Sequence, residues 1–229
     1  DLTKGFTQNC TGSNSCTDSY QQDRVDVLKE YADYSWSLDP THYTIFEHLG
    51  NDNEEQVWAN YRLAETPSKG VMMWGKMTTA YSQLLMGLNS DDDISRIGSN
   101  AHVGFQGKRV MGYPESHDEE RVMYKAVTYG NSTNPSHNVK TLTTALSRMS
   151  ALGAISLLVP GPKMIWHFAD LGMNNSIFTA SNGVVNTDSD ATPGDAKLDT
   201  KPQPQWTNNW LADANRNKIY ADWSKMINL

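Results

Sequence analysis

The sequence predicts an α/β fold in which a parallel sheet is built from strand–helix units. Short apolar segments, rich in β-branched and aromatic residues, alternate with longer amphipathic segments, as parallel strands and their crossover helices do. Polar loops follow the short segments directly. Four such units amount to half of an eight-unit barrel, but a doubly wound sheet gives a similar pattern, and periodicity alone does not separate the two.

Four short segments are predicted strands, because their composition suits a pleated, half-buried surface. They span residues 43–46, 70–74, 109–113 and 163–168. The first leads to Glu47, and the third leads into the polar run that contains Asp118. In barrels of this type the chemistry lies on loops at the C-terminal ends of the strands. Glu47 and Asp118 are therefore candidate functional residues.

Amphipathic spacing predicts helices between and after these strands. They span residues 19–36, 53–64, 78–86, 138–158 and 215–229, with one more short helix just before a polar break at 128–136. The helix at 138–158 is the most apolar, so it should be well buried. Residues 87–108 are polar and irregular, and residues 169–206 are expected to form an extended loop with room for short hairpins.

The composition excludes several classes of protein. Of the 229 residues, 38% are hydrophobic and 20% are charged, which indicates a globular chain. The net charge of −7, with no local Lys/Arg cluster, argues against nucleic acid as a partner. Gly153 and Ser156 interrupt the longest apolar stretch, so no membrane span is expected. Seven Trp and ten Tyr suit stacking on sugar rings, or simply the filling of a core.

Cys10 and Cys16 lie close together in a polar stretch. They form a disulfide if the compartment is oxidising and are two free thiols otherwise. Neither a metal-binding cysteine cluster nor a redox C-x-x-C motif is present. Residues 1–6 lack the basic start and the apolar core of a signal peptide, so they do not indicate where the protein acts.

Carboxylates carry the best-defined chemistry in this sequence. Cleavage of a glycosidic bond with retention needs a carboxylate nucleophile and a carboxylic acid about 5–5.5 Å apart. Most of the 26 acidic side chains are expected to be solvated surface charge. Glu47 and Asp118 stand out because each follows a short apolar strand and begins a polar loop.

Four segments carry a more specific pattern. Residues 1–6 read DLTKGF, residues 45–48 IFEH, residues 115–121 ESHDEER and residues 160–173 PGPKMIWHFADLGM. In this order they resemble the ends of strands four, five, seven and eight of the catalytic barrel in the alpha-amylase family, glycoside hydrolase family thirteen. The residues of these four segments are most similar to those of amylases from Bacteroides-like bacteria. One short motif of this kind is weak, but four collinear motifs with strand–helix spacing are specific.

The resemblance implies that residues 1–229 are one domain, the C-terminal half of a catalytic (β/α)8 TIM barrel. This half holds strands five to eight with their helices, plus the end of strand four. Earlier strands and a calcium-binding loop domain would then precede Asp1. We therefore expect open sheet edges, covered by the missing N-terminal half or by self-association. An Asp1 at a frayed terminus would make the isolated chain a poor hydrolase.

The activity implied is retaining hydrolysis of α-1,4-glucosidic bonds in starch-like glucans. Asp1 would be the nucleophile, Glu47 the general acid and base, and Asp118 the residue that stabilises the transition state. His117 would donate a hydrogen bond to the same sugar ring, with a structural loop histidine as the alternative. The rival functions are an inactive carbohydrate-binding or structural fragment, and a family relative acting as a glucanotransferase or an α-1,6-glucosidase.

The resemblance also implies further substrate contacts. Lys4 and His48 would face the leaving-group side of the cleaved bond. Arg121 matches a basic residue that lies near the glucan in some relatives, although an ion pair with Glu119 or Glu120 explains it equally well.

Three further expectations and one departure from the family pattern complete the prediction. Trp74, at a strand end, can stack on sugar, although a buried core tryptophan is the plainer interpretation. Gly5 stands where many relatives offer calcium a backbone carbonyl, so a structural calcium is expected, bound mostly by the missing half. His167 and Asp170 depart from the Gln and Glu common in close relatives. The resemblance places the protein outside the cytoplasm: secreted, periplasmic or on the cell surface.

Overall fold

The computed structural model describes residues 2–11, 13–179, 185 and 205–229. Its residues group into two compact units, each assembled from separate stretches of chain. Unit 1 comprises residues 1–76, 95–112 and 159–164, and unit 2 comprises residues 77–94, 113–158 and 165–229. The single domain over residues 1–229 stays a prediction, and each unit is described here by itself.

Three of the four predicted strands are confirmed. They are β1 (Ile45–Phe46), β2 (Met72–Lys76) and β3 (Val110–Tyr113), which form a sheet in the order β1-β2-β3. β1 and β2 are parallel, and Ile45 is opposite Met72. β1 is shorter than predicted, and β2 begins and ends two residues later than the predicted strand. Unit 1 therefore has the α/β character that the alternating pattern predicts.

Two isolated bridges extend this sheet at both edges. Leu2 pairs in parallel with Glu47, and Gly112 pairs in parallel with Lys163. The carbonyl of Thr44 accepts from Met72 N at 2.9 Å, whereas the carbonyl of Glu47 accepts from Thr3 N at 2.8 Å. Carbonyls an odd number of residues apart point to opposite edges of a strand. The segment at Leu2 and strand β2 therefore lie on opposite sides of β1.

The same alternation holds at β3. The carbonyl of Arg109 accepts from Met73 N at 2.7 Å, and that of Gly112 accepts from Met164 N at 3.3 Å. The segment at Lys163 thus lies on the far side of β3 from β2. Among the described residues of unit 1, the backbone segments of this sheet follow one another in the order of the sequence.

The predicted fourth strand, residues 163–168, is wrong in its extent. Only Lys163 pairs with the sheet, and the chain then turns into the 3-10 helix η5 (Ala169–Leu171). Phe168, which precedes η5, has a left-handed φ of 58° that a β-strand does not accommodate. An apolar composition alone did not reveal this turn.

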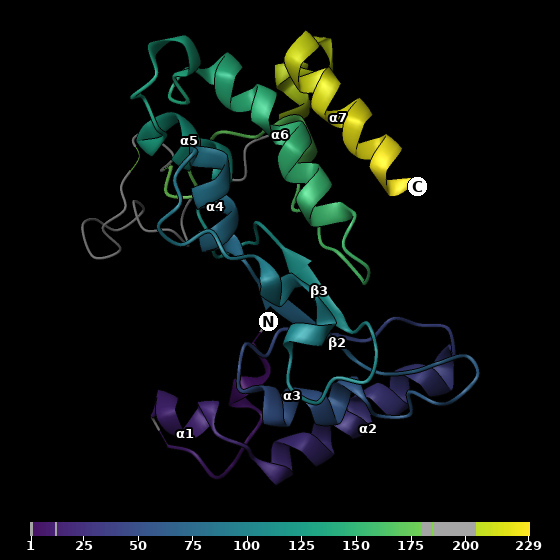
Figure 1. Cartoon of the computed structure of the whole chain (residues 1–229). Helices are drawn as coiled ribbons and strands as arrows, with labels where there is room; N and C mark the ends of the chain where they lie inside the picture. The colour runs from purple at the N-terminus through teal and green to yellow at the C-terminus, as the bar shows by residue number, and fades with distance from the viewer. Residues whose placement is uncertain (1, 12, 180–184, 186–204) are drawn as a thin grey trace. The chain divides into compact units, whose positions relative to one another are not determined.

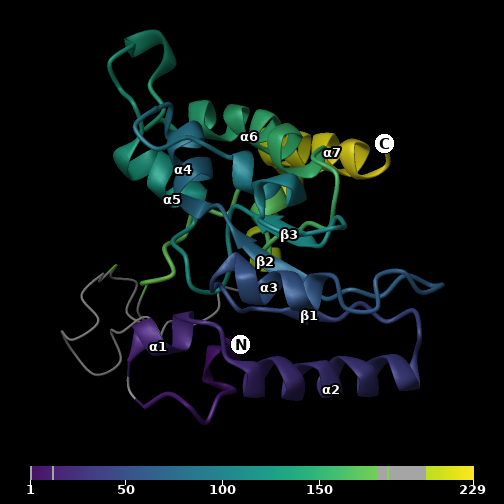
Figure 2. The same cartoon turned by 60° about the horizontal axis from the view of Figure 1, so that its bottom comes forward.

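Unit 1 has three α-helices and three short 3-10 helices among its described residues. They are η1 (Thr3–Gly5), α1 (Asn14–Asp18), α2 (Gln22–Leu38), α3 (Asp52–Ala59), η2 (Ser95–Ile97) and η3 (Ser99–Ala101). α2 and α3 supply the helical side of a small hydrophobic core. Figure 2 shows α2 and α3 lying next to each other beside the strands. Fully buried Trp58 of α3 contacts the ring of Phe46 edge-on and donates to the carbonyl of Val25 in α2 at 3.2 Å. This core joins both helices to β1.

α1 was not predicted, because its five residues lie in a polar stretch without apolar periodicity. Cys10 and Cys16 form a disulfide next to and within this helix, with their Cα atoms 5.7 Å apart. Of the two alternatives predicted for the cysteines, a disulfide and two free thiols, the structure contains the disulfide.

Unit 2 is mainly helical in its described residues, which also include the last residue of β3, Tyr113, and an isolated antiparallel bridge between Thr179 and Val185. Its elements are α4 (Thr78–Met86), α5 (Val122–Tyr129), η4 (Pro135–His137), α6 (Leu142–Leu157), η5, η7 (Gln205–Asn208), η8 (Trp210–Ala212) and α7 (Ala214–Ile227). α4, α6 and α7 lie where the sequence predicts helices, and α6 buries a face that includes Leu146 and Met149. Most of the predicted loop at 169–206 lies outside the described residues. No helix among those described has the length and apolarity to cross a membrane.

The contact between α6 and α7 depends on Gly153 (Figure 1). The indole of Trp223 in α7 is buried and donates to the carbonyl of Met149 at 2.9 Å. A Cβ atom at Gly153 would lie only 2.3 Å from Trp223 Nε1. The two helices pack this closely because residue 153 has no side chain.

Gly153→Ala is therefore expected to lower the free energy of unfolding by roughly 1–3 kcal/mol through overpacking. This sign opposes helix propensity, which favours alanine over glycine by about 1 kcal/mol. Urea denaturation measures the change. Ala151→Gly, at an exposed position of the same helix, is the control and should cost only the propensity difference. A Gly153→Ala variant more stable than the wild type would contradict this account of the contact.

Candidate functional site

Glu47 follows β1 directly, at the C-terminal end of the strand, as predicted. The side chain is largely buried, and its backbone carbonyl accepts from Thr3 N. Leu2, which pairs with Glu47, comes directly after the predicted nucleophile Asp1 in the chain. Asp1 itself lies outside the described residues, so its role stays a prediction. The pairing brings residues 2–6 to the strand end that carries Glu47.

His48 does not face solvent as a substrate-binding residue would. Its side chain is fully buried, and its ring lies 4.9 Å from that of Trp58. Nδ1 lies 2.9 Å from Thr3 Oγ1, and Nε2 lies 3.4 Å from a carboxylate oxygen of Glu54. Burial lowers the pKa of His48, although Glu54 opposes this effect. The geometry favours a neutral histidine that holds the chain, and it does not support the predicted sugar contact.

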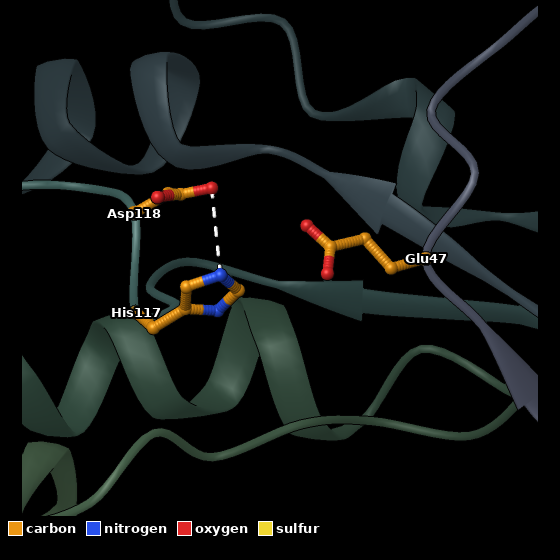
Figure 3. Close-up of side chains that lie close together, drawn as sticks. All are labelled: Glu47, His117 and Asp118. Atoms are coloured by element: carbon orange, nitrogen blue, oxygen red, sulfur yellow. Dashed lines mark ion pairs between the residues drawn. The ribbon is translucent and has the colours of Figure 1, made fainter. Parts of the chain in front are cut away.

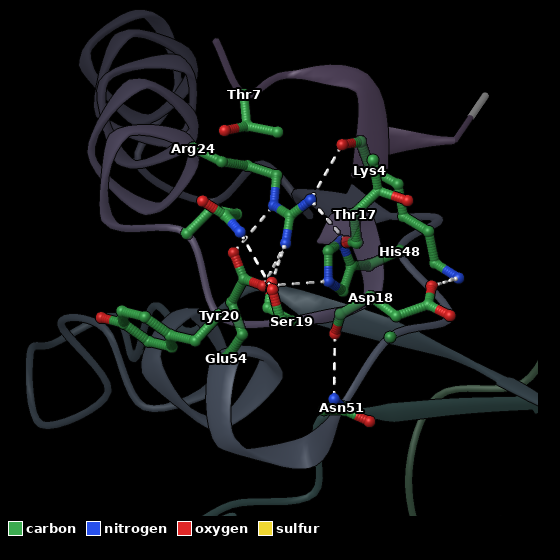
Figure 4. Close-up of polar contacts among 12 residues, drawn as sticks. Lys4, Thr7, Thr17, Asp18, Ser19, Tyr20, Arg24, His48, Asn51 and Glu54 are labelled. Atoms are coloured by element: carbon green, nitrogen blue, oxygen red, sulfur yellow. Dashed lines mark hydrogen bonds and ion pairs between the residues drawn. The ribbon is translucent and has the colours of Figure 1, made fainter. Parts of the chain in front are cut away.

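A buried ion pair next to His48 organises the N-terminal segment (Figure 4). Arg24 of α2 and Glu54 of α3 are both fully buried and form a two-pronged ion pair. The Arg24 guanidinium also donates to three backbone carbonyls at 2.8–3.0 Å. These carbonyls belong to Lys4, Thr17 and Ser19. One arginine therefore joins η1 and the end of α1 to the two main helices of unit 1.

Lys4 and Gly5 lie in η1, next to this network. Lys4 Nζ donates to Asp18 Oδ1 at 2.5 Å, and this hydrogen bond lowers the pKa of Asp18. Lys4 is thus engaged by α1 in this structure, and its predicted contact with glucan stays a prediction. Gly5 is exposed, and no atom lies within 4 Å of a Cβ built on it.

Calcium at Gly5 also stays a prediction. In the part of the chain that the structure describes, no cluster of three His, Cys, Asp or Glu side chains draws a member from residues 2–11 or 13–19. Gly5 can contribute one backbone carbonyl, whereas calcium takes six to eight oxygen ligands. Any such ion would need most of its ligands from elsewhere.

His117 and Asp118 form the exposed part of the candidate site in unit 2 (Figure 3). His117 Nε2 lies 3.5 Å from Asp118 Oδ2, and the two side chains are 40% and 54% exposed. The backbone N–H of Asp118 donates to Ser116 Oγ at 3.3 Å. Both predicted side chains are therefore open to a ligand, and the structure brings them together. Glu47 belongs to unit 1.

Arg121 is directed inward, contrary to the predicted glucan contact. Its side chain is only 3% exposed, Nη1 donates to the carbonyl of Ser116 at 2.9 Å, and the guanidinium lies over the Trp166 ring. Arg121 also forms an ion pair with Glu115, whose Oε2 lies 3.9 Å from Nη1, and the predicted ion pair with Glu119 or Glu120 stays a prediction. Burial lowers the pKa of Arg121, and the neighbouring Glu115 opposes this.

Glu115 is a residue that sequence reasoning missed. It is 1% exposed, and its Oε1 accepts from the backbone N–H of Val122, the first residue of α5, at 2.7 Å. Burial raises the pKa of Glu115 to about 7, against the opposing effects of Arg121 and of the Val122 N–H. The residue was part of the ESHDEER motif, yet no local pattern distinguished it from its neighbours.

Trp74 lies in the middle of β2, not at its end, and is half-buried. It does not belong to the buried core cluster around Trp58. Both the core interpretation of Trp74 and its sugar-stacking role therefore stay predictions.

A second group of titratable side chains, also missed, lies in unit 1. Oxygen and nitrogen atoms of Asp52, Glu55 and His102 all lie within 4.8 Å of one another, a spacing that a metal ion could bridge. Arg96 already supplies a positive charge here, since its Nη2 lies 2.7 Å from Asp52 Oδ1 and 3.1 Å from His102 Nδ1. The contacts with Arg96, whose side chain is 51% exposed, account for the group as a structural network.

Glu55 in this network gives a pH-dependent prediction. Burial raises its pKa to about 7, although the Gly50 N–H donates to it at 3.1 Å. An unfolded glutamate ionises near pH 4.3, so the folded protein holds an extra proton between about pH 4.5 and pH 7. The stability from this group is present at the acidic end and is lost as the pH rises.

Glu55→Gln should therefore flatten the fall in the free energy of unfolding between about pH 5 and pH 7, by at most about 1.4 kcal/mol per pH unit. Urea denaturation of the wild type and the variant across this range measures the difference between their pH slopes. Both proteins contain Glu115 and His102, so the contributions of these two residues cancel in that difference. Glu30→Gln, at an exposed position of α2, is the control and should keep the wild-type slope. Parallel curves for the wild type and Glu55→Gln would show that Glu55 ionises normally.

The sequence matches no protein-family model and no curated protein. The functional argument therefore rests on the residues and motifs of this chain.

Proposed function

We propose that this chain carries catalytic residues of a retaining glycoside hydrolase that cleaves α-1,4-glucosidic bonds in starch-like glucans. Its fold would be half of a (β/α)8 barrel, from the end of strand four to strand eight. Asp1 would be the nucleophile, Glu47 the general acid and base, and Asp118 a carboxylate that stabilises the transition state. The four collinear motifs suggest these roles.

The observation that carries this proposal is the order of the sheet. In unit 1 the segment at Leu2, the strands β1, β2 and β3, and the segment at Lys163 are neighbours in sequence order. A doubly wound sheet reverses its order at a switch point, whereas a barrel does not. The order thus favours the barrel interpretation that periodicity left open.

The proposed mechanism has two displacements. Asp1 attacks the anomeric carbon while Glu47 protonates the departing oxygen, which gives a covalent glycosyl-enzyme and a free glucan end. Glu47 then removes a proton from water, and the resulting hydroxide displaces Asp1 with net retention. Asp118 holds the distorted sugar, and His117 donates a hydrogen bond to it. The mechanism requires Asp1, Glu47 and Asp118 to converge on one ring.

Product analysis tests the proposal. The chain, alone and joined to any natural upstream sequence, is incubated with amylose, pullulan and sucrose, and the anomeric form of the fresh products is followed by NMR. We expect α-configured maltooligosaccharides from amylose with at least one of the two forms. β-configured products would exclude the retaining mechanism, and cleavage of pullulan or sucrose alone would favour the α-1,6-glucosidase or transferase alternatives. Glucan binding without cleavage in either form would indicate the inactive binding protein.

A further inference from the structure

Two buried charges lie beneath the loop that carries His117 and Asp118. Glu115 precedes the exposed pair and Arg121 follows it, and both side chains are almost completely buried. Among the described residues, Glu115 Oε2 and Arg121 Nε make no hydrogen bond. Buried charges are costly unless they are paired, so an incompletely satisfied pair in this position needs an explanation.

The first half of the explanation is the contact of Glu115 with α5. Its Oε1 accepts from Val122 N at 2.7 Å, at the helix start, where the backbone dipoles favour a negative charge. Its Oε2 lies 3.9 Å from Arg121 Nη1. Glu115 therefore ties both the start of α5 and the Arg121 side chain to the beginning of the loop.

The second half is a line of contacts from Arg121 to the exposed residues. The Arg121 guanidinium lies 5.7 Å from the centre of the Trp166 ring, and the Trp166 ring lies 6.0 Å from that of His117. His117 in turn contacts Asp118 at 3.5 Å. Arg121 Nη1 also donates to the carbonyl of Ser116, directly before His117. These contacts all lie within unit 2.

We propose that Glu115 is a positioning residue, which acts through Arg121 and Trp166 to set the orientation of His117 and Asp118. The catalytic part of this inference rests on the proposed glucan hydrolysis. Glu115 and Arg121 are buried and would not touch the substrate themselves. In its ionised form Glu115 holds the guanidinium between the Ser116 carbonyl and the Trp166 ring, and that ring limits the rotation of the imidazole.

Glu115→Gln is the main test, because the amide can still accept from Val122 N but no longer attracts Arg121. Small misplacements of catalytic groups cost about 100-fold in rate. We expect kcat on amylose to fall by about that factor, while KM changes by less than about threefold, since the exposed binding surface is kept. Asp222→Asn is the matched control and should leave kcat unchanged, because it removes an α7 carboxylate that accepts hydrogen bonds from Ser150 of α6 and Lys218 of α7, away from His117.

A second readout does not depend on activity. In NMR spectra, the ring signals of His117 should move in Glu115→Gln and, in a similar way, in Trp166→Leu, but not in Asp222→Asn. If the wild type cleaves no glucan, the proposed function fails, and these signals still decide whether Glu115 orients His117. Unchanged His117 signals together with wild-type kcat in Glu115→Gln would overturn the inference.

A double variant separates an effect on the position of His117 from an effect on folding. Glu115→Gln combined with Arg121→Met removes both buried charges, so the thermal midpoint should recover relative to Glu115→Gln alone. Because the support for Trp166 is still absent, kcat should stay low. Recovery of kcat together with the thermal midpoint would show that Glu115 acts only through stability and would reject the positioning role.

Discussion

Replacement of Glu47 by glutamine is expected to lower kcat/KM on amylose by at least about 10³-fold, within the range typical of lost general acid–base catalysis. The amide has nearly the same size as the carboxyl group, so the packing at the end of β1 should persist. It cannot protonate the departing glycosidic oxygen, and it cannot accept a proton from water in the second step. Both displacements of the proposed mechanism are therefore affected.

Three comparisons make the Glu47 prediction specific. With a maltosyl substrate whose leaving group needs no protonation, Glu47→Gln should lower the rate of the first step far less. Added azide, which attacks without a base, should then accelerate the second step and yield a glycosyl azide of retained configuration. Glu30→Gln, an exposed neutralisation on α2, should change kcat/KM by less than about twofold. Undiminished hydrolysis by Glu47→Gln would remove Glu47 from the mechanism.

The second large effect is expected in stability. Arg24→Met leaves the fully buried carboxylate of Glu54 without its guanidinium partner and leaves three carbonyls without a donor (Figure 4). Removal of one partner from a buried ion pair typically costs about 3–5 kcal/mol. We expect a loss of that size in the free energy of unfolding, measured by urea denaturation.

Two further variants are the controls for Arg24→Met: one removes an arginine at the surface, and the other removes both charges of the buried ion pair. Arg62→Met removes an arginine whose ion pairs with Asp33 and Glu65 are partly exposed, and it should cost less than about 1 kcal/mol. Arg24→Met combined with Glu54→Leu removes both buried charges and should recover part of the loss. A cost for Arg24→Met as small as that for Arg62→Met would mean that the buried network does not hold the N-terminal segment.

The same network relates stability to the proposed chemistry. Arg24 holds the carbonyl of Lys4, and His48 holds the side chain of Thr3, so the segment that begins at Leu2 is attached to unit 1 beside Glu47. Catalytic groups need positions accurate to a fraction of an ångström. We therefore regard His48 as a residue that supports the strand end, in place of the sugar-binding role predicted for it.

The sequence by itself determined the elements whose signals are local. Apolar periodicity predicted α4 at residues 78–86 and, within a few residues, α2, α6 and α7, because it reports which face of a helix is buried. Composition also located β1, β2 and β3 and placed Glu47 and Asp118 directly after strands or in the loops that follow them. α1 and the turn at Phe168 had no such local signal.

Only the tertiary structure decided which way the polar side chains of the site face. His48 and Arg121 were predicted to reach the glucan, yet each is buried against a partner that no sequence spacing indicates: Glu54 for His48, and Trp166 for Arg121. Desolvation and ion pairing depend on atoms that the whole fold brings together. The burial of Glu115 therefore does not follow from its neighbours in the chain, and neither does its raised pKa.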